Sequence, residues 1–240
     1  MQIIIEIKGE NMKKSVIFLL FAAFLMPFAI LFAGCGEQQP IQVSTYNEFV
    51  DAIKGDKSVI QLMADIELPE QVLINRKVTL DLNGKKLYNT KDIWNEENNA
   101  WSLIAVGENG DVTISGNGTI AAKENDCYCV DARDGGRLVI EDGEFIGNIK
   151  AVYAYEGNVE IKGGTYSILQ KSSKFGYRLE INLYDDNRKA GTANLKIFGG
   201  TFKNFNPGDP MEEGYKILAD GYEANLVADS ETDYVVTKVQ

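Results

Sequence analysis

Val78-Thr79-Leu80-Asp81-Leu82-Asn83-Gly84 is the stretch that decides the fold, because four later segments repeat its pattern. Each copy starts with an apolar residue, any residue and another apolar residue, as in a strand with one buried face, and then breaks at a glycine-containing turn. The later copies are residues 112–118, 138–143, 159–164 and 195–200, and most are followed by a second short strand, at 119–120, 144–145, 165–166 and 201–202. A strand–bend–strand unit used five times predicts a solenoid.

Composition sets the class of protein and excludes several kinds of site. The chain has 240 residues, of which 45% are hydrophobic, and this suits one ordinary domain once processed segments are removed. The formal net charge of −11 opposes binding to a phosphate backbone, so nucleic acid is not an expected partner. Histidine is absent, which excludes Ser-His and Cys-His nucleophiles and every histidine metal site.

The first 35 residues have the pattern of an export signal. Residues 1–11 look like an upstream extension, and from Met12 the chain has a basic pair (13–14), an apolar run (16–32) and small residues before Cys35. This ending resembles the lipobox of bacterial lipoproteins, although Phe32 stands where that family prefers leucine. The resemblance implies a lipid on Cys35, a membrane partner, a polar tether over 36–40 and a location in the cell envelope, outside the cytoplasm. The alternative is an uncleaved membrane anchor, because the run approaches the length of a bilayer span.

Several local patterns predict elements around the repeats. Thr45 and Glu48 form a capping box for a helix that ends at Gly55, and this helix would cover the first repeat. The polar run 89–99 predicts a protruding surface loop, and 221–227 with 234–239 predicts an antiparallel hairpin that closes the other end. Asn83 and Asn117 are expected at left-handed backbone corners.

Cys127 and Cys129 flank Tyr128, so in a strand their thiols would point to the same face. They could form a redox or metal pair, but no second cysteine pair completes such a site. The interpretation favoured by the burial preference of free cysteine is a stacked pair of buried thiols.

The unit at 78–84, together with the Gly-Gly-Thr-aromatic sequences at 163–166 and 199–202, resembles right-handed parallel β-helix proteins of the pectate-lyase-like superfamily. Within that superfamily it is similar to small, mostly uncharacterised domains in surface proteins of gut bacteria and in their phages. The resemblance covers about residues 41–240. It implies an all-β, right-handed parallel β-helix with a short N-terminal capping helix and a C-terminal β-hairpin.

Many members of that superfamily cleave polysaccharides with carboxylates, bound calcium and a basic residue, so the acidic pairs are candidate catalytic groups. Asp185 and Asp186, with Arg188, could hold a substrate or Ca²⁺ in an apparent turn over 185–191. Aspartate is an ordinary turn residue, so a solvated turn is the favoured interpretation. Asp131 and Arg133 are likewise interpreted as a charged edge rather than a catalytic pair. No catalytic residue and no cofactor is therefore assigned.

Four aromatic residues are candidate ligand contacts: Trp94, Trp101, Tyr177 and Tyr184. Aromatic rings supply stacking area for sugars or protein partners, although Trp101 and some tyrosines could instead pack inside the repeats. The expected function is that of a non-catalytic cell-envelope lipoprotein whose rigid β-helix binds a glycan or a surface protein. The alternatives are a polysaccharide lyase or glycoside hydrolase that acts through acidic residues, and a phage or prophage structural protein.

Overall fold

The computed structural model of the chain describes residues 39–170 and 180–240. The predicted export signal, Cys35 and Tyr177 lie outside these residues. The described part is built mostly of β-strands in three largely parallel sheets, which confirms the predicted all-β class.

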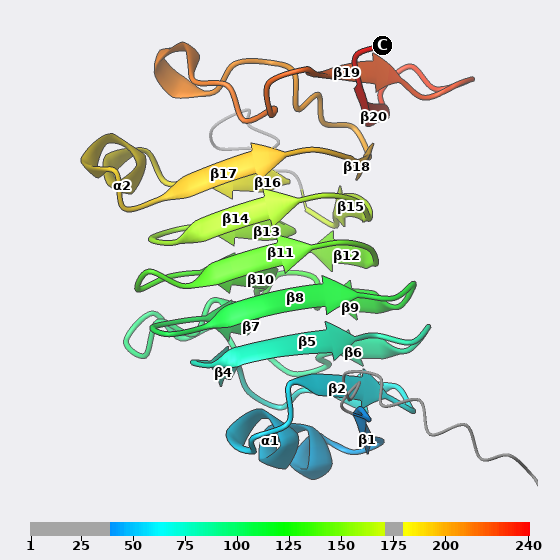
Figure 1. Cartoon of the computed structure of the whole chain (residues 1–240), viewed down its shortest axis with the longest axis vertical. Coiled ribbons are helices and arrows are strands. Elements are labelled where there is room, and N and C mark those ends of the chain that lie inside the picture. The colour runs from blue at the N-terminus through cyan, green and yellow to red at the C-terminus, as the bar shows by residue number, and fades with distance from the viewer. Residues whose placement is uncertain (1–38, 171–179) are drawn as a thin grey trace, which may run out of the picture. The chain divides into compact units, whose positions relative to one another are not determined.

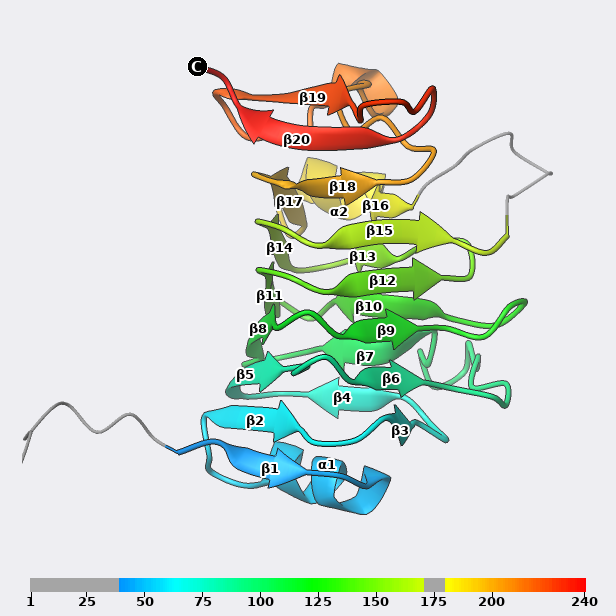
Figure 2. The same cartoon turned by 90° about the vertical axis from the view of Figure 1, so that its right-hand side faces the viewer.

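Each sheet takes every third strand of the repeat region, and Figures 1 and 2 show the strands of one sheet stacked above one another. Sheet A has the order β1 (Ile41–Val43), β2 (Val59–Leu62), β5 (Lys77–Asp81), β8 (Asp111–Ser115), β11 (Arg137–Ile140), β14 (Asn158–Ile161) and β17 (Asn194–Ile197). Sheet C has the order β16 (Ile181–Leu183), β13 (Val152–Ala154), β10 (Tyr128–Ala132), β7 (Ser102–Val106) and β4 (Val72–Ile74). Sheet B has the order β19 (Tyr222–Leu226), β20 (Tyr234–Lys238), β18 (Gly200–Phe202), β15 (Thr165–Ile168), β12 (Glu144–Gly147), β9 (Thr119–Ala121), β6 (Lys86–Tyr88) and β3 (Ile66–Glu67).

The repeated apolar triplets pair in parallel and in register, as their shared pattern predicts. Val78 of β5 lies opposite Val112 of β8, which lies opposite Leu138, and the row continues through Val159 to Leu195. The second short strands of the repeats form the matching rows of sheet B. Equivalent positions of successive repeats are therefore direct neighbours in space.

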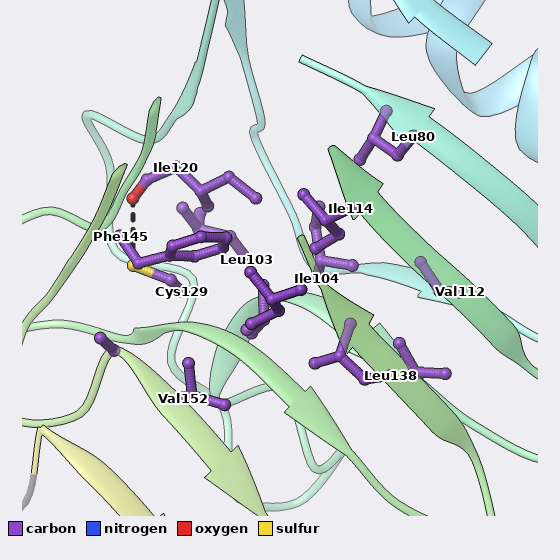
Figure 3. Close-up of a cluster of buried hydrophobic side chains, with 14 of the residues drawn as sticks. Leu80, Leu103, Ile104, Val112, Ile114, Ile120, Cys129, Leu138, Phe145 and Val152 are labelled. Carbon is purple, nitrogen blue, oxygen red and sulfur yellow. Dashed lines mark hydrogen bonds between the residues drawn. The ribbon is translucent and has the colours of Figure 1, made fainter. Parts of the chain in front are cut away.

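Side chains from all three sheets meet in one apolar core. Figure 3 shows Leu80 and Ile114 of sheet A, Ile120 of sheet B and Ile104 and Val152 of sheet C pointing into the same interior. Each of these five side chains is fully buried. Burial of apolar surface is the main favourable term in folding, so this shared interior is what joins the three sheets.

The Gly-Gly pairs mark the bend between sheet A and sheet B. A Cβ on Gly163 would lie 2.2 Å from the carbonyl oxygen of Glu141 in the preceding repeat, closer than any side chain allows. The next residue, Gly164, has φ +89°, a left-handed conformation that glycine adopts without strain. Gly199 and Gly200 repeat the arrangement. The first glycine of each pair thus avoids a clash with the preceding repeat, and the second adopts a left-handed backbone conformation.

A capped helix covers the first strands of sheet A, as predicted. Helix α1 (Tyr46–Lys54) starts with the capping box of Thr45 and Glu48, ends at Gly55, and buries Phe49, Ala52 and Ile53. Arg76, which precedes β5, donates through Nε to the carbonyl oxygen of Ile53 (2.6 Å) and through Nη2 to that of Ala52 (2.7 Å). The guanidinium thus adds donors to carbonyl groups of the last helical turn, where a helix runs out of backbone N–H partners.

The other end of the repeats is closed by the predicted hairpin. Strands β19 and β20 pair antiparallel, and β20 also pairs antiparallel with β18, the last strand of the parallel stack in sheet B. Val236 of β20 is buried against the core. The hairpin therefore satisfies the edge that β18 would otherwise expose.

Two local predictions are wrong. Residues 185–191 do not form a simple turn, because Asp185–Ala190 is a short helix, α2, that ends at Gly191 with φ 79°. Asn117 does not occupy a left-handed corner, because the neighbouring Gly116 takes that conformation (φ 81°), whereas Asn83 has the predicted positive φ of 46°. A second short helix, η1 (Glu212–Gly214), lies in the long connection before the hairpin.

We expect the aromatic row inside sheet B to dominate the stability of its last strands. Tyr166 is fully buried, and its ring stacks between Phe145 (centroids 5.2 Å apart) and Phe202 (4.9 Å). Y166A should lower the free energy of unfolding by about 3–5 kcal/mol, measured by urea denaturation. Y166F loses the hydrogen bond to the Gly163 carbonyl (2.7 Å) and should cost about 1 kcal/mol. Equal losses in both variants would contradict this account.

Candidate binding site

A continuous row of aromatic rings lies on the side of sheet C that faces away from the core. Tyr153 of β13 contacts Tyr128 of β10 (centroids 5.7 Å apart) on one side and Tyr155 (5.7 Å) on the other. Trp94 packs edge-on against Tyr128 (5.4 Å), and Tyr184 contacts Tyr155 (5.1 Å). We call these five residues the aromatic row. Trp101 packs against it through Tyr155 (5.3 Å).

Lys150 lies over two rings of the aromatic row. Its Nζ is 4.2 Å from the ring centroid of Tyr153 and 4.8 Å from that of Tyr128, and 3.5 Å from the Tyr128 hydroxyl oxygen. Among the residues that the structure describes, no carboxylate forms an ion pair with this ammonium. Burial lowers the pKa of Lys150 from 10.5 to about 8, and burial also raises the pKa of Tyr128 to about 12.

Asp131 and Arg133 form a buried ion pair, which corrects the prediction of a charged edge. Asp131 is fully buried and Arg133 is 6% exposed, and the guanidinium binds both carboxylate oxygens at 2.6 Å. Ser102 donates a further hydrogen bond to Asp131. Burial raises the pKa of Asp131, while the hydrogen bonds from Arg133 and Ser102 oppose that shift. The guanidinium carbon lies 4.3 Å from the ring centroid of Trp101, so both partners of the pair are well packed.

The loop at 89–101 covers this ion pair, and we call it the covering loop. Its Asn99 carbonyl accepts a hydrogen bond from Arg133, and Ile93 in its middle is buried. The buried carboxylate of Asp126 accepts from the backbone of Trp94 (2.9 Å) and from the side chain of Asn89 (2.6 Å). The prediction of a protruding loop is therefore incomplete, because the segment is irregular but lies fixed against sheet C.

A cleft of about 460 Å³ lies between the covering loop and the connection from β3 to β4. Its lining includes an indole, two carboxylates and three amides: Trp94, Glu70, Asp92, Gln71, Asn95 and Asn98. Trp94 is 38% exposed although its backbone is held by Asp126. An exposed aromatic face beside polar groups offers a small polar ligand both stacking area and hydrogen-bond partners.

The acidic candidates lie elsewhere, on and next to α2. Arg188 pairs with Asp185 (3.1 Å) and with Glu213 of η1 (3.4 Å), and Asp186 accepts from the hydroxyl of Tyr184 (3.2 Å). Among the described residues, no group of three or more Asp, Glu or Cys side chains could hold a metal ion. The candidate arginine is thus engaged in ion pairs that join two short helices.

The structure brings together three of the four predicted contact residues. Trp94 lines the cleft and belongs to the aromatic row, as does Tyr184, and Trp101 packs against that row. Trp101 and Tyr184 are half-buried, while Tyr177 lies outside the described residues. Sequence reasoning missed Tyr128, Tyr153 and Lys150. Alternation in β13 offered a signal, because burial of Val152 and Ala154 in the core places Tyr153 on the opposite face.

The two cysteines are free and buried, as the favoured interpretation predicts. Cys129 donates to the carbonyl oxygen of Ile120 (3.1 Å), and burial raises its pKa to about 12, which keeps it an unreactive thiol.

None of the helices in the described residues is long and apolar enough to span a bilayer. No family model, no curated protein and no solved structure matches the chain.

We expect the buried ammonium of Lys150 to cost stability in a pH-dependent way. Between about pH 8 and 10.5 the unfolded chain holds this proton and the folded chain does not, so stability from this group rises with pH across that window. At pH 7 the free energy of unfolding of K150M should therefore be about 1–3 kcal/mol higher than that of the wild type. This difference should vanish near pH 10.5. Urea denaturation at both pH values measures it, and a variant less stable than the wild type at pH 7 would contradict the expectation.

Proposed function

We propose that residues 41–240 form a right-handed parallel β-helix that binds glycans at the Trp94 cleft, without catalysis, outside the cytoplasm. The pairing of each strand with the strand three places along the chain supports a path that visits sheets A, B and C in turn. The in-register rows of equivalent residues support the same path. The resemblance to pectate-lyase-like proteins points in this direction as well.

The cell-envelope location is supported by the sequence of the first 35 residues. A basic pair, an apolar run and Cys35 in a lipobox-like context favour a lipid anchor. Radioactive palmitate should label the wild-type chain expressed in bacteria and should not label C35S. Equal labelling of the two chains would overturn the anchor.

The observation that carries glycan binding is the exposed indole of Trp94 on a fixed loop, beside the amides and carboxylates of the cleft. Sugars present apolar faces that stack on aromatic rings and hydroxyl groups that bind amides and carboxylates. The covering loop is held by Asp126 and by the antiparallel bridge between Asn95 and Ala100, so little conformational entropy is lost on binding. Protein surfaces are a less suitable ligand, because the site is a polar cleft and not a broad apolar patch.

A glycan array with the purified full chain, followed by calorimetry on the bound glycans, tests this proposal. W94A should weaken binding at least tenfold, about 1.4 kcal/mol, while W94F should retain most of the affinity because it keeps a stacking face. L226A, which removes an exposed apolar side chain from the distant hairpin, is the matched control and should bind normally. Unchanged binding by W94A would overturn the site, and release of unsaturated sugars from uronate polymers would overturn the non-catalytic assignment.

A further inference from the structure

The two carboxylates of the Trp94 cleft differ in how their charge is balanced. Asp92 forms an ion pair with Lys123, with Nζ 2.5 Å from Oδ1. Glu70 accepts a hydrogen bond from the hydroxyl of Tyr46 (2.7 Å), which is a neutral donor. Glu70 is in none of the ion pairs found among the described residues, and the lining of the cleft includes no lysine or arginine.

Tyr46 holds Glu70 at the cleft from the side of α1. The pKa of Tyr46 is raised to about 12, first by burial and then by the hydrogen bond and charge of Glu70. The phenol therefore stays a proton donor at neutral pH and fixes one carboxylate oxygen without cancelling the charge. The chain as a whole carries a net charge of −11, which favours the approach of cationic over anionic ligands at low salt.

Two of the three side-chain amides of the cleft are already oriented by hydrogen bonds. Nε2 of Gln71 donates to the carbonyl oxygen (3.0 Å) and to the hydroxyl of Ser102 (3.1 Å). Oδ1 of Asn95 accepts from the backbone of Glu97 (3.0 Å) and Asn98 (3.3 Å). Since amides are neutral and Asp92 is paired with Lys123, the charge of Glu70 is the feature of the cleft that would discriminate ligands by charge.

We propose that Glu70 makes the Trp94 cleft select glycans that carry a protonated amine, and reject glycans that carry carboxylates. The inference rests on the proposed glycan binding and adds its specificity. An ammonium beside Glu70 gains an opposite charge and a charge-assisted hydrogen bond, while the indole of Trp94 stacks on the sugar ring. A uronate in the same place would meet the carboxylate of Glu70 with no cation in the lining to offset the repulsion.

The test compares three oligosaccharides of equal length by calorimetry with the purified full chain: a chitosan oligomer, its N-acetylated counterpart and an oligogalacturonate. In a mildly acidic, low-salt buffer the chitosan oligomer should bind about fivefold more tightly than the acetylated one, and the oligogalacturonate should not bind. E70Q keeps the size and the Tyr46 contact of the side chain but removes its charge, so it should abolish the fivefold preference for the chitosan oligomer. E108Q, in the turn at the far end of β7, is the matched control and should keep the preference.

The outcomes distinguish a failure of the proposed charge preference from a failure of the glycan site itself. Equal binding of the first two oligomers by the wild type, an undiminished preference in E70Q, or binding of the oligogalacturonate would overturn the role of Glu70. In each of those cases, glycan binding that is weakened by W94A would still support the glycan site. Failure of both amino-sugar oligomers to bind would overturn the inferred selectivity, and binding that W94A leaves unchanged would overturn the glycan site as well.

Discussion

Parallel, in-register pairing is the constraint on which the rest of this structure depends. Once Val78 pairs with Val112 and Val112 with Leu138, every repeat must offer an apolar residue at the same place, or the core would hold an unsatisfied polar group or a cavity. Extra residues can therefore enter only where the chain passes between sheets. The bends from sheet A to sheet B stay short, as at residues 162–164 and 198–199, where a Cβ on the first glycine of each Gly-Gly pair would clash with the backbone of the preceding repeat.

The passage from sheet B to sheet C is where the chain varies most. The covering loop lies between β6 and β7, and Lys123, Asp126 and Lys150 belong to the same connection in later repeats. Because successive repeats are stacked, residues distant in sequence meet on this side: Asp126 holds the backbone of Trp94, and Lys150 lies over Tyr128. The site thus combines loops of free length with strands whose register is fixed, which is how loops on rigid scaffolds acquire function.

Much of the fold could be predicted from the sequence because its signals are local. The apolar triplets, the capping box of Thr45 and Glu48 and the final hairpin each depend on neighbouring residues alone. The burial of Asp131 could not be predicted in this way. Its strand position points away from the core, and only the covering loop, through Asn99 and Trp101, removes it from water. The sequence predicts Trp94 as a contact residue. Glu70, which lines the same cleft, and Asp126, which binds the backbone of Trp94, come from other repeats, so they could not be found without the register.

The most direct test of the in-register stacking is a distance measurement between spin labels on sheet A. Val59, Thr79 and Lys196 are half-buried and occupy matching positions of β2, β5 and β17. In the order of sheet A, β2 lies five strands from β17, and β5 lies four strands from β17. With a spacing of about 4.8 Å per strand, the backbone separation should be about 19 Å for the pair 79–196 and about 24 Å for the pair 59–196. Narrow distance distributions for the two pairs, with means that differ by about one strand spacing, would support the stacking. Equal separations for the two pairs, or a shorter one for 59–196, would contradict it.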